Sequence, residues 1–164
     1  MLLGIISDSH DNLPKIDAAV TKLNALGVKL VLHAGDYCSP FSALRFQRLA
    51  SKMIGIFGNN DAEKDVLKSK FESLGHDVKG RFLSLEIEGV RIGVTHGDEE
   101  NLLEDLVRSQ SYDLIISGHT HSIHQLRRGR TLCLNPGEIC GYLSGRATIA
   151  TLETSTRSVE ILDI

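Results

Sequence analysis

Short apolar runs alternate with segments of helical periodicity along the first half of the chain. Between these runs, aliphatic residues recur at three- and four-residue spacing, which predicts amphipathic helices. Ser39 followed by Pro40 is typical of a helix N-terminus. Three successive strand–helix units favour parallel strands that are covered on both faces. The predicted strands are Leu2–Ser7, Lys29–Ala34 and Lys52–Phe57, and the predicted helices are Asp11–Leu26, Pro40–Leu49 and Ala62–Leu74.

The second half of the chain has a different pattern. Phe82–Glu88 and Val90–Thr95 alternate on either side of Gly89, which predicts an antiparallel hairpin. Glu99–Ser109 has helical spacing, and Asp113–Ser117 is a further buried strand. We therefore expect an α/β domain whose sheets turn antiparallel toward the C-terminus. No linker or repeat divides the chain, so a single domain over residues 1–164 is expected. The remaining alternating segments are Ile123–Arg127, Thr131–Leu134, Ala147–Glu153 and Ser158–Leu162.

Composition narrows the class of protein. A hydrophobic content of 41% with 24% charged residues is ordinary for a globular protein. The net charge of −3 argues against a stable complex with nucleic acid, and the run Arg127, Arg128 and Arg130 fits a solvated hairpin turn. The apolar N-terminal run is too short to span a membrane and lacks the features of a signal peptide. Three cysteines without a CxxC spacing indicate reduced thiols, so we expect a cytoplasmic location and no membrane partner.

Polar residues gather where the predicted strands end. Ligands of open α/β sheets bind just outside the carboxyl ends of the strands, so these clusters are expected to meet in one cleft. Cysteine stands in none of them, so we do not expect a structural zinc site. The five clusters are Asp8-Ser9-His10-Asp11, Gly35-Asp36, Gly58-Asn59-Asn60-Asp61, Thr95-His96-Gly97-Asp98 and Gly118-His119-Thr120-His121.

The chemistry of these clusters predicts a metal centre. Carboxylates and imidazoles gathered without a cation would be costly to bury. A mixture of nitrogen and oxygen ligands suits Mn²⁺, Fe²⁺, Ni²⁺ or Zn²⁺ better than Ca²⁺ or Mg²⁺. Seven ligands are too many for one ion and suit two, which requires a bridging carboxylate and an ion separation of ~3.5–4 Å. The candidate metal ligands are Asp8, His10, Asp36, Asn59, His96, His119 and His121.

Each cluster taken alone has a simpler interpretation. Asp8 and Asp11 could serve simply to cap the first helix, and residues 59–61 could serve simply as a turn and helix cap. His33 lies within a strand pattern and is expected in the core, whereas His76 and His124 are expected at the surface. Recurrence at five equivalent positions favours a functional site.

In sequence order, the motifs DSH (8–10), GD (35–36), GNND (58–61), HG (96–97) and GHTH (118–121) resemble those of the calcineurin-like metallophosphoesterases. The resemblance covers nearly the whole chain and is greatest to the small prokaryotic YfcE-like phosphodiesterases. It implies a four-layer αββα sandwich, with two mixed β-sheets flanked by helices and two metal ions at one end.

The resemblance also implies roles for individual residues. Asp8, His10 and His121 would hold one metal ion, and Asn59, His96 and His119 would hold the second, with Asp36 bridging them. The residues assigned to catalysis on this basis are Asp36, Asn60, Asp61 and His96, with Asn60 and Asp61 orienting the ligands or the substrate.

The chain departs from the family pattern at two places. Many relatives read GDxxD, whereas Tyr37, Cys38 and Ser39 follow Asp36 here. Many phosphatases of this family have a histidine at the position of Asn60, which protonates the leaving group. Asparagine cannot act as a general acid. This change favours substrates with good leaving groups or a proton from another source.

These features predict a metal-dependent phosphodiesterase that uses two divalent ions, Mn²⁺ first among them, and a metal-bridging hydroxide without a covalent enzyme intermediate. Its substrate would be a small-molecule or nucleotide phosphate ester. A catalytically weak protein-interaction scaffold of the same fold, a phosphomonoesterase and a cyclic-nucleotide hydrolase remain alternatives. A homodimer through exposed edges of the C-terminal sheet is also expected.

Overall fold

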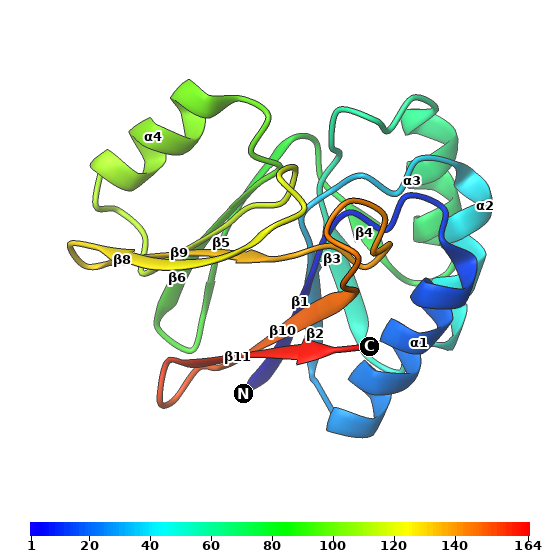
Figure 1. The fold of residues 1–164 in the computed structure, drawn as a ribbon, viewed down its shortest axis with the longest axis horizontal. Coiled ribbons are helices and arrows are strands. Elements are labelled where there is room, and N and C mark those ends of the chain that lie inside the picture. Colours follow the sequence, from blue (N-terminus) through cyan, green and yellow to red (C-terminus); the bar gives the residue numbers. More distant parts are fainter.

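Two mixed β-sheets lie face to face in the computed structural model, which describes residues 1–164 (Figure 1). The first sheet has six strands in the order β11-β10-β1-β2-β3-β4, and the second has five in the order β5-β6-β7-β9-β8. The strands of the first sheet are β1 (Leu2–Ile6), β2 (Leu30–His33), β3 (Lys52–Gly55), β4 (Asp77–Val78), β10 (Thr148–Glu153) and β11 (Ser158–Asp163). Those of the second are β5 (Phe82–Ile87), β6 (Val90–Thr95), β7 (Leu114–Ile116), β8 (Ile123–Arg128) and β9 (Thr131–Pro136).

Helices cover the outer face of the first sheet, and one helix lies beside the second. The first sheet carries three helices and a 3₁₀ turn, whose apolar faces enclose a core that includes Ile16, Phe46 and Phe71. A second core, which includes Ile5 and Ile92, fills the space between the sheets. The predicted αββα sandwich is thereby confirmed. None of its helices is both long and apolar enough to cross a bilayer. The helices are α1 (Leu13–Leu26), α2 (Pro40–Ala43), η1 (Leu44–Arg48), α3 (Lys64–Ser73) and, beside the second sheet, α4 (Glu100–Arg108).

Strand direction explains why the site forms at one end. β1, β2 and β3 are parallel, with Ile5 opposite Leu32. β10 pairs antiparallel with β1, and β11 pairs antiparallel with β10. In the second sheet β6, β7 and β9 are also parallel. The prediction that the sheets turn antiparallel toward the C-terminus is therefore wrong for these three strands. α4 and the long connection through β8 act as crossovers, which parallel neighbours require.

Helix boundaries follow local capping. α1 begins after Asn12, whose side chain accepts a hydrogen bond from the Lys15 N–H, and it ends at Gly27 with a left-handed φ of 68°. The predicted helix Pro40–Leu49 is divided into α2 and η1. Ser39 does not cap it, because its hydroxyl donates to Asp11 instead.

The histidines outside the strand ends are placed differently from one another. His33 is buried and His124 is exposed, as predicted. The prediction that His76 lies at the surface is wrong, since only 4% of its surface is exposed. Its ring accepts a hydrogen bond from the Met53 N–H at 3.2 Å and lies 3.1 Å from the Phe46 carbonyl. The two backbone groups explain why a polar ring is stable there.

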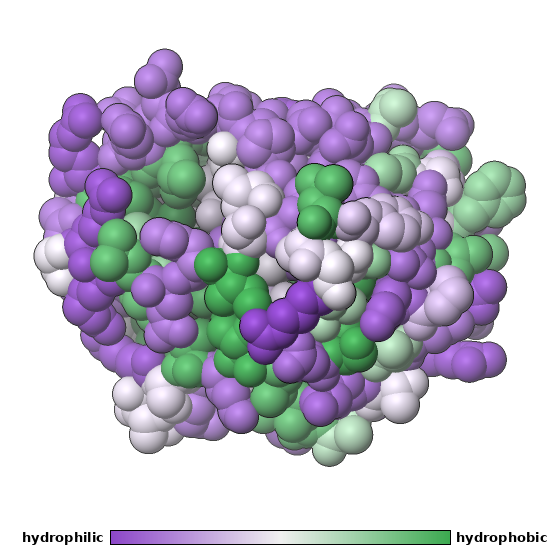
Figure 2. All heavy atoms as spheres, in the orientation of Figure 1, coloured by the Kyte–Doolittle hydropathy of each residue, from purple (hydrophilic) through white to green (hydrophobic).

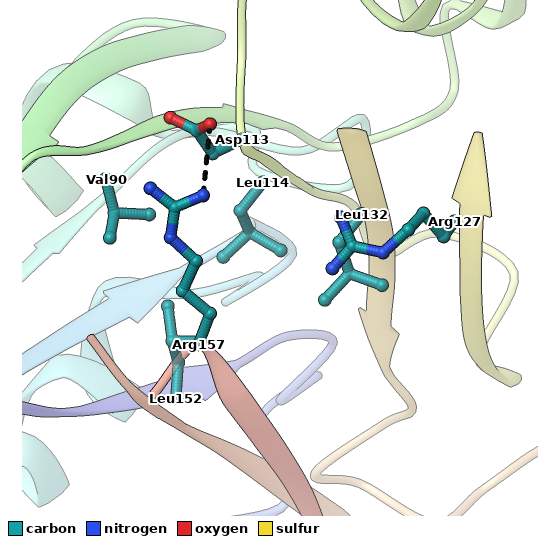
Figure 3. Close-up of a pocket in the computed structure, with 7 residues that line it drawn as sticks. All are labelled: Val90, Asp113, Leu114, Arg127, Leu132, Leu152 and Arg157. Carbon is teal, nitrogen blue, oxygen red and sulfur yellow. Dashed lines mark ion pairs between the residues drawn. The ribbon is translucent and has the colours of Figure 1, made fainter. Parts of the chain in front are cut away.

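Asp113, a buried carboxylate just before β7, lies at the opposite end of that strand from the candidate ligands, and Figure 3 shows Arg157 beside it. Asp113 accepts hydrogen bonds from Arg91 and Arg130, and Arg157 lies 3.6 Å from it. Leu114 and other aliphatic side chains line a small hollow beneath Arg157. This ion-pair cluster closes that end of the sandwich.

Candidate metal centre

All seven predicted metal ligands lie in loops that follow β1, β2, β3, β6 and β7, and the structure gathers them into one cluster. Asp8, His10 and His121 form a group whose ligand atoms lie within 4.8 Å of one another. Nε2 of His10 and Nε2 of His121 lie 3.7 and 3.6 Å from Oδ1 of Asp8. The two imidazole rings stack with centroids 4.9 Å apart. This group has the size and composition of a metal-binding triad.

Asp36 and His96 extend the cluster from its other side. Together with Asp8 they form a second set with ligand atoms within 4.8 Å. Oδ2 of Asp36 lies 3.2 Å from Nε2 of His96 and 3.4 Å from Nε2 of His10. Nδ1 of His96 is 2.8 Å from the Ala34 carbonyl, which fixes that nitrogen as the donor and leaves Nε2 free. One carboxylate oxygen thus faces imidazoles from both sides.

Asn59 and His119 form the rim of the cluster. Nδ1 of His119 lies 3.0 Å from Oδ1 of Asn59, and the ring of His119 meets that of His96 edge-on at 5.3 Å. The backbone N–H of His119 donates to Asp8 at 3.1 Å. Both rim side chains are exposed, so this side of the cluster is open to solvent.

The cluster fits a bound cation. Nε2 of His10 and Nε2 of His96 are buried and have no hydrogen-bond partner. Buried polar atoms without a partner cost free energy, and both nitrogens face the carboxylate of Asp36. A divalent ion between the nitrogens and the carboxylates would satisfy all of them. The mixture of nitrogen and oxygen donors suits first-row transition ions.

The backbone is strained at the same residues. A positive φ is rare for residues other than glycine and costs about 1–3 kcal/mol when maintained. Gly58 and Gly118 make the tight packing possible, because a Cβ at either would overlap the carboxylate of Asp36 or Asp8. Five predicted ligands have positive φ, namely Asp8 (53°), His10 (40°), Asp36 (61°), His119 (66°) and His121 (57°).

Asp61 positions the loop that carries Asp36. Its carboxylate accepts four backbone N–H groups, from Asp36, Tyr37, Cys38 and Gly58, at 2.7–3.0 Å. Burial raises the pKa of Asp61, while these donors oppose that shift. Its place in the structure is therefore that of a positioning residue that holds two ligand loops together.

Asn60 holds the carboxylate of Asp36 directly. Its backbone N–H donates to Oδ1 at 2.9 Å and its side-chain amide donates to Oδ2 at 2.7 Å. Burial opposes ionisation of Asp36, but the nearby His96 imidazole and the hydrogen bonds from Asn60 outweigh it and lower the pKa of Asp36 below its usual range. An asparagine here keeps the carboxylate charged and oriented.

The carboxylates raise the pKa of two imidazoles in the cluster. Burial alone would lower the pKa of His10, but the nearby carboxylate of Asp8 and the contact with Cys38 raise it to about 10. The pKa of His96 is also raised: burial opposes this, and Asp36 outweighs burial. The carboxylates therefore attract positive charge into the centre, which a metal ion would supply more strongly than protons do.

Sequence reasoning missed Glu138, which is fully buried behind His121. Oε2 of Glu138 lies 2.6 Å from Nδ1 of His121, and the backbone N–H groups of Leu143 and Ser144 donate to the same carboxylate. Burial would raise the pKa of Glu138, but hydrogen bonds from Cys140, His121 and Ser144 lower it to about 2. A carboxylate in this position fixes the tautomer of a ligating histidine and strengthens it as a ligand.

Two cysteines border the cluster. Sγ of Cys38 is 3.2 Å from Nδ1 of His10, and Sγ of Cys140 donates to Glu138 at 2.8 Å. Both follow turns that bring the chain back to the strand ends. Cys38 contacts the predicted ligand His10 itself, and Cys140 contacts Glu138 behind His121.

Comparisons with known proteins agree with this geometry. A family model described as a calcineurin-like phosphoesterase superfamily domain matches residues 1–157. Phosphodiesterase MJ0936 of Methanocaldococcus jannaschii is 38% identical over 158 residues, which cover 96% of this chain and 95% of that protein. A solved structure of a novel archaeal phosphodiesterase has a TM-score of 0.96 and 36% identity, and the match covers 100% of both chains.

The structure of YfcE, a phosphoesterase from E. coli, covers 100% of both chains with a TM-score of 0.75 and 22% identity. This likeness shows that the fold is shared. The family match spans most of the chain and contains every candidate ligand. The chain belongs to the calcineurin-like phosphoesterase superfamily and is a hydrolase that acts on phosphoester bonds.

Proposed function

We propose that this protein is a phosphodiesterase whose centre holds two divalent metal ions, bridged by Asp36. The proposal rests on the position of Oδ2 of Asp36, which lies 3.4 Å from the free nitrogen of His10 and 3.2 Å from that of His96. An oxygen placed between two imidazole groups is suited to bridge two ions. Asp8, His10 and His121 would complete one ion's ligands, and Asn59, His96 and His119 the other's.

When bound, two ions would lower the pKa of a water ligand and polarise the phosphoryl oxygens. The chain's own residues would orient the ligands and keep the bridging carboxylate charged. Asn60 would keep the bridging carboxylate of Asp36 in place, and Asp61 would hold its loop. The exposed rim at Asn59 and His119 would admit the substrate.

A diester substrate is favoured over a monoester by two observations. The relative with 38% identity is named a phosphodiesterase. The side chain of Asn60 donates to Asp36 and has no proton to give to a leaving group. Monoesters with poor leaving groups depend most on such a proton. We therefore propose diesters with good leaving groups as the preferred substrates and Mn²⁺ as the preferred ion.

Hydrolysis of bis-p-nitrophenyl phosphate beside p-nitrophenyl phosphate tests this function. Metal-stripped protein should be inactive, and added Mn²⁺ should restore cleavage of the diester above that of the monoester. Preference for the monoester would contradict the role given to Asn60. Bound metal without cleavage of either ester would favour the interaction scaffold.

The cytoplasmic location, the homodimer and the single domain over residues 1–164 stay predictions.

A further inference from the structure

A groove of about 660 Å³ lies between α4 and the outer face of the second sheet. Leu103 and Val107 of α4 line one wall, and Cys133 of β9 lies opposite. Figure 2 shows an apolar surface recessed beneath hydrophilic side chains in the region of α4 and the β8–β9 hairpin. The volume is that of a small-molecule site.

α4 does not close onto the sheet. No residue of α4 is buried, although Leu103 and Val107 face the sheet from one side of the helix. The start of the helix is fixed, because Arg81 pairs with Asp98 and Glu99 just before it. An amphipathic helix held at a distance leaves room for a ligand beneath its apolar side.

The pairing register of β7, β8 and β9 gives the direction and length of the groove along the sheet. Ser117 directly follows β7, and His124 pairs with Asn135 at the same end of the sheet. Cys133 lies opposite Ile115, two residues further from that end. Arg128, at the tip of the hairpin, marks the far end. Four residues of strand separate the two ends, which is a length of roughly 13 Å.

The near end of the groove is lined by residues that stand close along the chain to two candidate ligands. Ser117 is followed directly by Gly118 and His119, and α4 begins four residues after His96. A phosphoryl group held at His96 and His119 would therefore direct one substituent along the groove.

Charge within the groove leaves one cation without a partner. Arg108 lies 3.7 Å from Glu104, whereas the guanidinium of Arg128 makes no ion pair or hydrogen bond. The middle of the groove is apolar. An elongated occupant with an apolar body and a polar or anionic far end matches this distribution.

We propose that the groove binds one of the two ester groups of the substrate, an aryl or nucleoside-sized group that lies between Val107 and Cys133. This inference rests on the proposed phosphodiesterase function, because the phosphoryl group must be anchored at the metal centre. Leu103, Val107 and Arg128 then determine which diesters bind tightly.

Calorimetric titration of Mn²⁺-loaded protein with phosphonates tests the groove, because a P–C bond is not hydrolysed. Methylphosphonate reaches only the metal centre, whereas 4-biphenylphosphonate carries an apolar group of the length of the groove. The wild-type protein should bind the biphenyl compound at least about tenfold more tightly. Val107→Trp and Leu103→Trp each fill the groove and should remove this gain while leaving methylphosphonate binding unchanged.

Leu106→Trp is the matched control, because Leu106 is half-buried on the same helix but does not line the groove. It should retain the tenfold gain. An equal gain in all four proteins, with melting temperatures like that of the wild type, would overturn the groove proposal. Failure of both phosphonates to bind the wild-type protein would contradict the metal centre itself, and so the function on which this inference rests.

Discussion

Nδ1 of His121 lies 2.6 Å from Oε2 of Glu138, and Glu138 is fully buried. This contact orients the imidazole so that its other nitrogen faces Asp8, 3.6 Å away. The carboxylate is itself held by backbone N–H groups of residues 142–144. A rigid loop thus controls the position of a predicted metal ligand.

We expect Glu138→Gln to weaken metal binding about 10–100-fold, because an amide supports the histidine less strongly than a carboxylate. Titration of metal-stripped protein with Mn²⁺ would measure the change. Glu86→Gln, which alters an exposed side chain of β5, is the control. Equal affinity in the wild-type protein and Glu138→Gln would show that the contact with His121 does not support a metal ligand.

Asp36→Asn should lower diester hydrolysis by at least about a thousandfold while the protein stays folded. An amide cannot bridge two cations as a carboxylate does. Steady-state rates with bis-p-nitrophenyl phosphate, beside circular dichroism, would measure both effects. Asp65→Asn changes an exposed residue of α3 and should leave the rate unchanged. A rate near that of the wild type in Asp36→Asn would remove Asp36 from the centre.

Asp61→Ala should destabilise the fold by about 3–5 kcal/mol, because four buried N–H groups lose their acceptor. Urea unfolding would give this difference. Asp61→Asn keeps one carbonyl oxygen and should cost less. A loss of stability no greater than that of Asp65→Ala, at the exposed position on α3, would be inconsistent with the role assigned to Asp61.

Acid should destabilise the protein through Asp113. The pKa of Asp113 is lowered from 3.8 to about 2. The hydrogen bond from the Arg91 N–H is the largest cause, and the hydrogen bond from Arg130 adds to it, whereas burial opposes both. A carboxyl group with a lowered pKa in the folded state contributes stability above its unfolded pKa. That contribution is lost as the pH falls from about 4 to about 2. Melting temperatures should therefore fall more steeply there in the wild-type protein than in Asp113→Asn, and parallel curves would argue against this ion-pair cluster.

Most strands and all the strand-end clusters were predictable from the sequence, because period and end position are local signals. The four-layer sandwich was implied by the family resemblance. β5 and β6 and the helix α4 lie within a residue or two of their predicted bounds. The parallel pairing of β7 with β9 was not predictable, since β8 separates them along the chain. Pairing of this kind depends on the packing of distant segments.

Residues that support the site were harder to predict than its candidate ligands. Glu138 follows the end of β9, so it occupies the same kind of position as the other clusters, within NPGE. A single acidic residue in a turn carries no distinguishing pattern. The burial of His76 was not predictable, because its two partners, the Met53 N–H and the Phe46 carbonyl, come from elsewhere in the chain.

The proposed function depends on a pair of metal ions that share Asp36. Electron paramagnetic resonance of metal-stripped protein with two equivalents of Mn²⁺ tests for this pair directly. We expect the spectrum of an exchange-coupled pair, because one carboxylate oxygen would lie between both ions. A spectrum of isolated Mn²⁺ ions only would contradict a bridged two-metal centre.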